Sequence, residues 1–374
     1  MKKTNYIAME LNNKKSILIA AGASGGHLFS ASGISSELNK RGYQILLLTD
    51  NRVKDLLVNF PAEKIIIIPS DTFTNKSPLK WPMAFFKLVL GFFISFFWII
   101  KMRCVLAIGL GGYPSVAPLI AAKFCGLRML IHEQNRILGR ANYFLLPLAD
   151  LVTKGFDDKG IVPKKYCHKV KFSGNPVREE ILNFKSTKKN IQKEKFNILI
   201  FGGSQGASYF TSLIPKVLDE LPSKTLNNLK LIQQVRKEDI SILEENYSKR
   251  KISYLVKDFF YNLPEIISKA DLIISRSGAS TISEMAVIGK PCIFIPLNNT
   301  LDGDQEYNAK RLDEYGAAIV FNQINLKPYK LSKKIEELIS NPQNLNALSS
   351  KIKKFGFADA SENIAKFSEN LIRR

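Results

Sequence analysis

The chain has 374 residues, which exceeds the length at which a single hydrophobic core stops growing, so two domains are expected. Its hydrophobic content of 45% argues against a disordered chain and against an integral membrane protein. The net charge of +21 indicates an anionic partner, namely a phosphorylated substrate, an acidic membrane surface or a nucleic acid, although part of it is lysine that simply solvates loops.

Neither the N-terminus nor the cysteines indicate an oxidising compartment. The basic N-terminal residues are not followed by an apolar core, so no secretion signal is predicted. The cysteines lie far apart, with no CxxC pair and no histidine at a metal-binding spacing, and therefore predict reduced residues of a cytosolic protein. They are Cys104, Cys125, Cys167 and Cys292.

Apolar runs of strand length recur along both halves of the chain, and helical patterns separate most of them. They cover residues 16–20, 44–49, 64–68, 104–108 and 128–132, and then 196–201, 229–234, 252–256, 271–275 and 291–295. Such alternation predicts an α/β protein with parallel sheets that are covered by helices on both faces. In sheets of this kind, ligands bind at the carboxyl ends of the strands.

An uncharged segment, Leu88–Ile100, follows Trp81, Phe85 and Phe86. Its 13 residues are fewer than the roughly 20 that cross a bilayer. Two interpretations stay open. The segment forms either a helix edge that dips into an anionic membrane interface, or a buried helix that covers the sheet. The nearby cations are Lys80, Lys87, Lys101 and Arg103.

The charged segment 185–195 lacks apolar periodicity and is the best candidate for an interdomain linker. We therefore expect one Rossmann-like domain over residues 1–180 and a second over 181–355. A last helical pattern within 356–374 could return to the first domain.

Four glycine-rich turns, at 21–27, 109–113, 201–207 and 275–279, each follow an apolar run. Glycine lets the backbone approach an anion closely, and the N–H groups of a following helix favour phosphate. Neither the G-x-G-x-x-G fingerprint nor a P-loop occurs, which argues against a nicotinamide enzyme and an NTPase. The turns predict two similar domains that face one phosphorylated ligand across a central cleft.

Seven motifs occur in the order found in the MurG family of glycosyltransferases, which the chain resembles from about residue 16 to about residue 320. They are GASGGH (22–27), GGY (111–113), HEQN (132–135), GNPVR (174–178), GGSQGA (202–207), RSGASTISE (276–284) and DQEYNA (304–309). The resemblance implies a GT-B fold, with acceptor and membrane binding in the first domain and UDP-sugar binding in the second.

The implied reaction moves N-acetylglucosamine from UDP-N-acetylglucosamine to the C4 hydroxyl of the muramyl sugar of lipid I. The product is lipid II, an intermediate of peptidoglycan synthesis, and the anomeric configuration inverts. The implied partners are these two substrates and the anionic inner leaflet, with no nucleic acid, no cofactor and no metal. The protein would then be a peripheral protein on the cytoplasmic face of the cell membrane.

The departing diphosphate must be neutralised, and the sequence lacks an Asp-x-Asp metal motif in a suitable turn. Helix N-termini and an arginine would replace the metal. The resemblance assigns Ser204 and the turn around it to the nucleotide and Arg178 to the phosphates. The alternative for Arg178 is an ordinary surface ion pair.

The resemblance also assigns the rest of the donor pocket. Glu284 would accept hydrogen bonds from both ribose hydroxyls, with a helix-surface charge as the alternative. Phe260 would pack against the uracil ring. Gln305 and Asn308, three residues apart on one helix face, would bind the donor sugar, as would Asn135. The residues that would line the pocket are Ala279, Ser280, Thr281, Ile282 and Ser283.

His27 ends the first glycine-rich turn, beside Ser24, Gly25 and Gly26, where the acceptor would lie. Its near-neutral titration suits a general base that deprotonates the attacking hydroxyl. The alternative is that His27 binds acceptor phosphate without taking a proton. His132 and Glu133 either belong to the site or order its loop.

Two other functions stay open from the sequence alone. One is a different UDP-sugar enzyme of GT-B fold, such as a diacylglycerol glucosyltransferase or a UDP-N-acetylglucosamine epimerase. The other is a basic protein that binds nucleic acid, which the charge allows but no recognisable motif supports.

Overall fold

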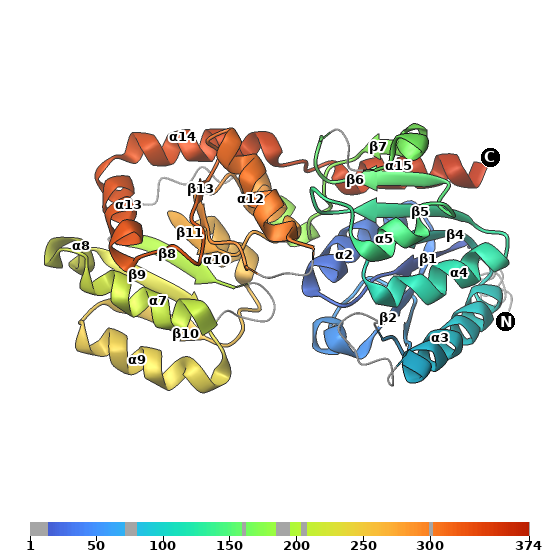
Figure 1. Cartoon of the computed structure of the whole chain (residues 1–374), viewed down its shortest axis with the longest axis horizontal. Coiled ribbons are helices and arrows are strands. Elements are labelled where there is room, and N and C mark those ends of the chain that lie inside the picture. The colour runs from blue at the N-terminus through green and yellow to red at the C-terminus, as the bar shows by residue number, and fades with distance from the viewer. Residues whose placement is uncertain are drawn as a thin grey trace, which may run out of the picture. The chain divides into compact units, whose positions relative to one another are not determined.

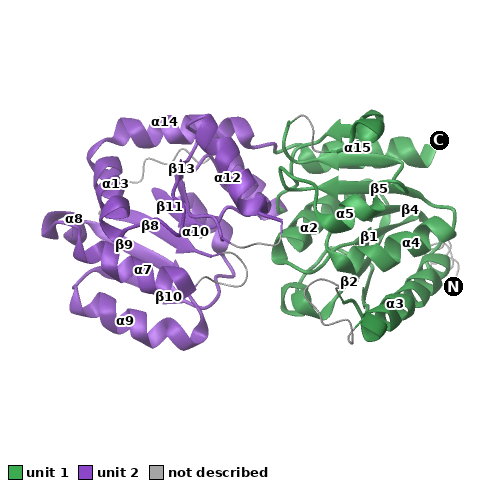
Figure 2. Cartoon of the chain, viewed as in Figure 1, with its two compact units in different colours: residues 1–178, 358–374 green, residues 179–357 purple. Residues whose placement is uncertain are grey.

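The protein is described here by a computed structural model that covers residues 14–71, 81–158, 162–184, 195–202, 208–298 and 302–373. The chain forms two compact units (Figure 2). Unit 1 contains residues 1–178 and 358–374, and unit 2 contains residues 179–357.

Unit 1 is built on a seven-stranded sheet with the order β3-β2-β1-β4-β5-β6-β7, in which all neighbours pair in parallel. The strands are β1 (Ser16–Ala20), β2 (Gln44–Thr49), β3 (Lys64–Ile67), β4 (Cys104–Gly109), β5 (Arg128–Glu133), β6 (Leu151–Lys154) and β7 (Val170–Phe172). Because the strands are parallel, their carboxyl ends meet at one edge of the sheet. The turns that contain residues 21–24 and 110–112 leave the sheet at that edge.

Helices cover both faces of this sheet (Figure 1). Alternate residues of β1 enter two separate cores, as expected for a strand that is buried on both faces. Ile17 and Ile19 share a core with α2 (Gly25–Lys40) and α15 (Ala360–Arg373). Leu18 and Ala20 share the other core with α3 (Trp81–Lys101), α4 (Val116–Phe124) and α5 (Arg140–Leu145).

Helix α15 follows unit 2 in the sequence but packs within unit 1. Arg41, at the end of α2, forms an ion pair with Glu369 of α15 at 2.9 Å. The side-chain amide of Asn363 donates to the carbonyl oxygen of Ser173 at 3.4 Å. The end of the chain is thereby tied to the sheet of unit 1.

Unit 2 has a six-stranded parallel sheet with the order β10-β9-β8-β11-β12-β13. The strands are β8 (Phe196–Phe201), β9 (Leu229–Gln234), β10 (Ser253–Lys257), β11 (Leu272–Ser275), β12 (Cys292–Phe294) and β13 (Ile319–Val320). The helices are α6 (Glu179–Leu182), α7 (Ser208–Asp219), α8 (Ser223–Asn227), α9 (Ile240–Lys249), α10 (Leu263–Lys269), α11 (Ala279–Ile288), α12 (Asp304–Glu314), α13 (Pro328–Ser340) and α14 (Pro342–Ile352). One hydrophobic core joins α7, α9 and α13 to the sheet.

The structure confirms the predicted α/β class, and all ten predicted strands are present with ends within one residue of the expected positions. The sequence pattern missed β6, β7 and β13, which have only two to four residues each. Two to four residues are too few to show a hydrophobic period on their own, and β12 was predicted because it lies within the longer apolar run 291–295. The division between the units falls in the sequence between residues 178 and 179, and most of the expected linker lies outside the described residues.

Candidate active site

The first glycine-rich turn leads from β1 into α2 and places His27 in the first turn of that helix. Nδ1 of His27 lies 2.9 Å from the carbonyl oxygen of Gly22 and 3.2 Å from Oγ of Ser24. A carbonyl oxygen can only accept, so Nδ1 carries the proton of the neutral ring and Nε2 carries the lone pair. Gly25 and Gly26 also lie in the first turn, where backbone N–H groups have no acceptor within the helix.

The second glycine-rich turn, after β4, lies against His27. Gly111 and Gly112 have φ angles of +87° and +74°, a region that other residues rarely adopt. A Cβ atom at Gly111 would lie 3.5 Å from Nε2 of His27, and one at Gly112 would lie 3.2 Å from the carbonyl oxygen of Gly22. The two glycines thus allow the turns to approach each other, and they keep side chains away from Nε2.

Glu133 orders the loop that follows β5. Its Oε1 accepts from the backbone and side-chain N–H groups of Asn135 at 2.9 and 3.3 Å. Its Oε2 accepts from the N–H of Gly139 at 2.9 Å and from Nδ2 of Asn142 at 2.8 Å. Burial raises the pKa of Glu133, although these hydrogen bonds oppose the rise. The carboxyl group therefore serves as a hub for the loop that carries half-buried Asn135.

His132 is fully buried and links three segments of unit 1. Its Nε2 lies 3.1 Å from Oδ1 of Asn175, and its Nδ1 lies 3.0 Å from Oγ1 of Thr153. Nδ2 of Asn175 donates to the carbonyl oxygen of Gln134, so Oδ1 must be the acceptor of that amide and His132 carries its proton on Nε2. Burial lowers the pKa of His132 to about 4. Its contacts support the interpretation in which it orders the loop.

The turn at 174–178 brings Arg178 onto α2. Oγ of Ser30 donates to the carbonyl oxygen of Pro176 at 3.3 Å. The guanidinium carbon of Arg178 lies 4.4 Å from the centroid of the Phe29 ring, a cation–π contact. Arg178 is therefore held over the helix that also carries His27.

In unit 2, a buried arginine ties the turn after β11 to the segment after β12. Nη1 of Arg276 donates to the carbonyl oxygens of Ile295 and Pro296 at 2.9 and 3.0 Å. Its guanidinium carbon lies 5.1 Å from the rings of both Tyr209 and Phe210. Burial lowers the pKa of Arg276.

Gln305, at the start of α12, is tied to the same two segments. Oγ of Ser277 donates to the carbonyl oxygen of Gln305 at 2.8 Å, and Oε1 of Gln305 accepts from the N–H of Leu297 at 3.0 Å. Because Oε1 is the acceptor, Nε2 is the side-chain group that can donate to a ligand. Asn308 has no exposed surface, and its Nδ2 donates to the carbonyl oxygen of Ser277 at 3.3 Å. Asn308 therefore links α12 to the turn after β11.

Helix α11 begins after Gly278, and its first turn offers backbone N–H groups from Ala279, Ser280 and Thr281. The N–H of Ile282 donates to the carbonyl oxygen of Gly278, and the side chain of Ile282 is 1% exposed. Oγ of Ser283 donates within the helix to the carbonyl oxygen of Ala279. Glu284 lies one turn into the helix and is buried rather than on the surface, in contrast to the surface-charge alternative.

Three further expectations concern the donor site. Phe260 is 5% exposed, and the residue that follows it, Tyr261, is 92% exposed. Ser204 lies outside the described residues. Within the described ranges, no group of three or more His, Cys, Asp or Glu residues could hold a metal ion.

Three residues that shape these sites have no role that was predicted from the sequence. Asp50 contacts the first glycine-rich turn, and Asn142 contacts Glu133 in the loop at 133–139. Arg276 holds the segment after β12. The position of Asp50, directly after β2 at the carboxyl edge of the sheet, is the signal that could have identified it.

Comparison with known proteins gives consistent results. The glycosyltransferase family 28 N-terminal domain matches residues 17–153, and the family 28 C-terminal domain matches residues 197–364. A protein of Allorhizobium ampelinum is 37% identical over 92% of both chains, and one of Methylobacterium sp. (strain 4-46) is 38% identical over 93% of this chain and 95% of its own. Both are named UDP-N-acetylglucosamine–N-acetylmuramyl-(pentapeptide) pyrophosphoryl-undecaprenol N-acetylglucosamine transferase. The crystal structure of MurG from Acinetobacter baumannii superimposes with a TM-score of 0.74 at 25% identity and covers 95% of this chain and 99% of that one.

Proposed function

We propose a function that follows from the family to which this chain belongs, the MurG family of glycosyltransferase family 28. It transfers N-acetylglucosamine from UDP-N-acetylglucosamine to lipid I, the pyrophosphoryl-undecaprenol-linked muramyl pentapeptide. The observation that carries this function is the similarity, at 37 and 38% identity over more than nine-tenths of the chain, to relatives named for that reaction. The same similarity argues against the epimerase, glucosyltransferase and nucleic-acid alternatives.

His27 is the general base of the transfer in this proposal. The C4 hydroxyl oxygen of the muramyl sugar attacks the anomeric carbon of the donor as the bond from that carbon to the diphosphate oxygen breaks. The electron pair leaves with UDP, the configuration inverts, and Nε2 of His27 takes the hydroxyl proton. The contact from Nδ1 to the carbonyl oxygen of Gly22 supports this role, because it holds Nε2 in the basic form.

The negative charge that develops on the departing UDP requires nearby positive potential. The N-terminal turn of α11 supplies backbone N–H groups of the type that bind phosphate. We assign Arg178 as a phosphate-binding cation, and the contact with Phe29 supports this by fixing its guanidinium. We also propose that Ser204 contacts the nucleotide, as the resemblance implies.

Donor recognition follows from the groups that each residue can offer. Glu284 would accept hydrogen bonds from the two ribose hydroxyls, and Gln305 would donate from Nε2 to an oxygen of the sugar. Asn135 would contact the same sugar, in a loop that Glu133 holds in place. Phe260, which is 5% exposed, would pack against the uracil ring.

We also propose that α3 binds the anionic cytoplasmic face of the cell membrane. One stripe of α3 packs inward and is buried, and it consists of Ala84, Gly91, Ser95 and Ile99. The outer side is at least 42% exposed, and it consists of Trp81, Met83, Phe85, Phe86, Leu90, Phe93, Phe97 and Ile100. Phe124, at the end of α4, is 75% exposed and packs edge-on against Phe92. So many exposed apolar side chains on one helix favour an interface over an ordinary core.

The length of α3 corrects the expectation that this segment is too short to cross a bilayer. With 21 residues, α3 includes Lys87, and among the described residues it is the one helix long and apolar enough to span a membrane by length and composition. If α3 crossed a membrane, its buried stripe would lose its contacts with the rest of unit 1. A Cβ at Gly91 would lie 3.4 Å from Cβ of Ala117 on α4, which shows how closely the two helices pack. Binding in the interface keeps these contacts.

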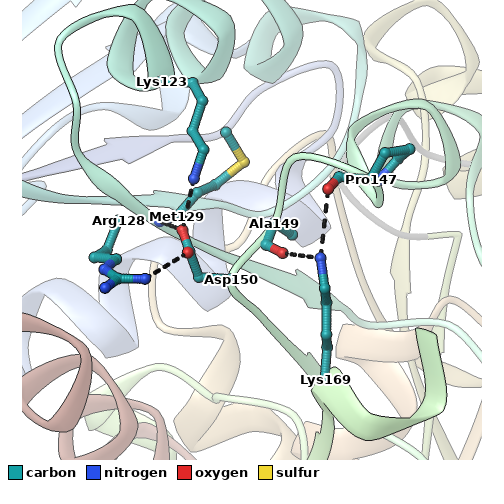
Figure 3. A network of polar contacts seen from close by, with 7 residues as sticks. All are labelled: Lys123, Arg128, Met129, Pro147, Ala149, Asp150 and Lys169. Atoms are coloured by element: carbon teal, nitrogen blue, oxygen red, sulfur yellow. Dashed lines mark hydrogen bonds and ion pairs between the residues drawn. The ribbon is translucent and has the colours of Figure 1, made fainter. Parts of the chain in front are cut away.

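The cations beside α3 differ in how much charge they can offer to lipid. Lys87 is paired with Asp71 at 3.0 Å, so its charge is partly offset, and Lys80 lies outside the described residues. Nζ of Lys101 lies 4.7 Å from the centroid of the Trp98 ring. Lys123, which precedes Phe124, shares Asp150 with Arg128, and Lys169 donates to the carbonyl oxygens of Pro147 and Ala149 (Figure 3). Two cations on one carboxylate leave a net positive charge there.

The experiment that tests the reaction is a UDP-release assay. The full chain is incubated with UDP-N-acetylglucosamine, with a soluble lipid I analogue, with both and with neither. UDP release only when both are present supports the transferase. Release from the donor alone would favour a hydrolysing epimerase or a hydrolase. No release under any condition, together with salt-sensitive DNA binding, would favour the nucleic-acid alternative.

A further inference from the structure

Asp50, which no motif includes, directly follows β2 and is 4% exposed. Its Oδ1 accepts a hydrogen bond from the backbone N–H of Ala23 at 3.2 Å. Its Oδ2 accepts from Nε of Arg52 and from Oγ of Ser70. Both oxygens of this buried carboxylate are therefore occupied, and one of them holds the first glycine-rich turn.

The peptide group that Asp50 holds is the same one that contacts His27. The N–H of Ala23 and the carbonyl group of Gly22 belong to a single planar peptide unit. The N–H end of this unit donates to Asp50, and the carbonyl end accepts from Nδ1 of His27 at 2.9 Å. The carboxylate is thus connected to the imidazole through one rigid group, and a negative charge at one end makes the carbonyl oxygen at the other end a better acceptor.

Backbone strain at Ala23 favours rotation of this peptide. The φ angle of Ala23 is +69°, in the left-handed region, where the Cβ of a residue other than glycine lies too close to the following carbonyl oxygen. A flip of the peptide between Gly22 and Ala23 would move that angle to negative values. The same flip would turn the carbonyl oxygen of Gly22 away from His27.

We propose that Asp50 is a positioning residue that opposes this flip and so keeps His27 in the Nδ1–H tautomer needed for proton transfer. This inference rests on the proposed role of His27 as the base. Asp50 does not touch the substrate in this scheme. It acts on the reaction only through the peptide between Gly22 and Ala23.

The test combines two substitutions whose effects are linked only if this scheme is correct. Asp50→Ala is expected to lower kcat by at least tenfold, with the affinity for UDP unchanged. Ala23→Gly alone is expected to stay within threefold of wild type. In the double variant, glycine adopts the positive φ without strain and no longer drives the flip. The double variant should therefore recover at least a threefold part of the loss.

Two further variants separate positioning from a general loss of structure. Asp50→Asn keeps an oxygen that can accept from Ala23 and should stay closer to wild type than Asp50→Ala. Arg52→Gln removes the ion pair but not the contact with Ala23, and should stay within threefold. The nitrogen resonances of the His27 ring should show a smaller Nδ1–H population in Asp50→Ala than in wild type.

Two results would overturn the inference. One is an Asp50→Ala variant that binds UDP normally and keeps kcat within threefold of wild type. The other is a double variant no more active than Asp50→Ala. The proposed role of His27 fails separately, if His27→Ala itself remains active. An inactive His27→Ala beside an active Asp50→Ala would refute the positioning role alone.

Discussion

Nδ1 of His27 lies 2.9 Å from the carbonyl oxygen of Gly22, and this contact decides which ring nitrogen can accept a proton. We expect His27→Ala to lower kcat by roughly 10²–10⁴-fold, the usual contribution of a general base. The affinity for UDP should hardly change. Steady-state kinetics with a lipid I analogue and calorimetric UDP titration make the measurement. His168→Ala, at an exposed histidine of the same unit, is the matched control.

A His27→Ala variant with kcat within a few-fold of wild type would exclude the base. A raised acceptor KM with unchanged kcat would instead support the alternative in which His27 binds acceptor phosphate.

Glu284 should set the affinity for the nucleotide. Glu284 is 5% exposed, and the Glu284→Ala variant would lack the paired hydrogen bonds to the ribose hydroxyls. We expect a loss of roughly 1.5–3 kcal/mol in the binding free energy of UDP, since hydrogen bonds to charged groups contribute this much. Calorimetry on the full chain measures it, with Glu306→Ala on the exposed side of α12 as the control. Undiminished UDP affinity in Glu284→Ala would remove the assignment.

The fold was largely readable from the sequence, because long apolar runs such as 44–49 and 196–201 alternate with helical patterns. The motif turns were readable too, because glycine marks positions such as Gly111 and Gly112 where φ is positive. The sequence could not show that Asn308 is fully buried while Gln305 is only partly buried, since helical spacing puts both on one side but does not say how deep each is buried.

Contacts between distant segments were also beyond the sequence. Asp50 meets Ala23 only because β1 and β2 are neighbours in the sheet, and the pairing of Lys87 with Asp71 depends on where α3 docks. A sequence pattern carries no information on such pairings. The length of α3 was underestimated for a different reason. The paired Lys87 lies within the helix and does not end it.

Transfer should not require a divalent metal, because the proposed mechanism neutralises the diphosphate with helix N–H groups and Arg178. Activity should be the same in EDTA as in buffer with added magnesium or manganese. Loss of activity in EDTA that either ion restores would contradict the proposed mechanism.

Vesicle binding should depend on the outer side of α3. We expect binding to require anionic lipid and to weaken with salt, since each cation near the surface contributes about 1 kcal/mol. Phe93→Ser with Phe97→Ser should abolish cosedimentation with anionic vesicles and leave UDP binding intact, because both rings are more than half exposed. Ile242→Ser with Ile324→Ser, at exposed apolar residues of unit 2, is the control.

The charge component can be tested in the same assay. Charge reversal at Lys101 and Arg103 should weaken binding more than reversal at Lys87, whose charge Asp71 already offsets. Unchanged cosedimentation of the Phe93 and Phe97 double variant would contradict membrane binding by α3 and would support the alternative of an ordinary core helix.

His132 should make the stability of the protein depend on pH. Its pKa falls from 6.5 to about 4 on burial, so the unfolded chain binds more protons between these values. The free energy of unfolding should therefore decrease as the pH is lowered from 6.5 to 4, by about 3 kcal/mol from this residue alone. Urea unfolding at several pH values measures it. His132→Gln should show a smaller decrease, and identical pH dependence in both proteins would contradict a buried neutral histidine.

The central claim is the transfer of N-acetylglucosamine to lipid I, and the most direct measurement identifies the product. The full chain is incubated with UDP-N-acetylglucosamine and a lipid I analogue, and the lipid-linked product is analysed by mass spectrometry and by NMR. The account predicts a product heavier by one N-acetylglucosaminyl residue, attached in β configuration to the C4 oxygen of the muramyl sugar. An unmodified acceptor, or a sugar attached in α configuration or at another hydroxyl, would contradict it.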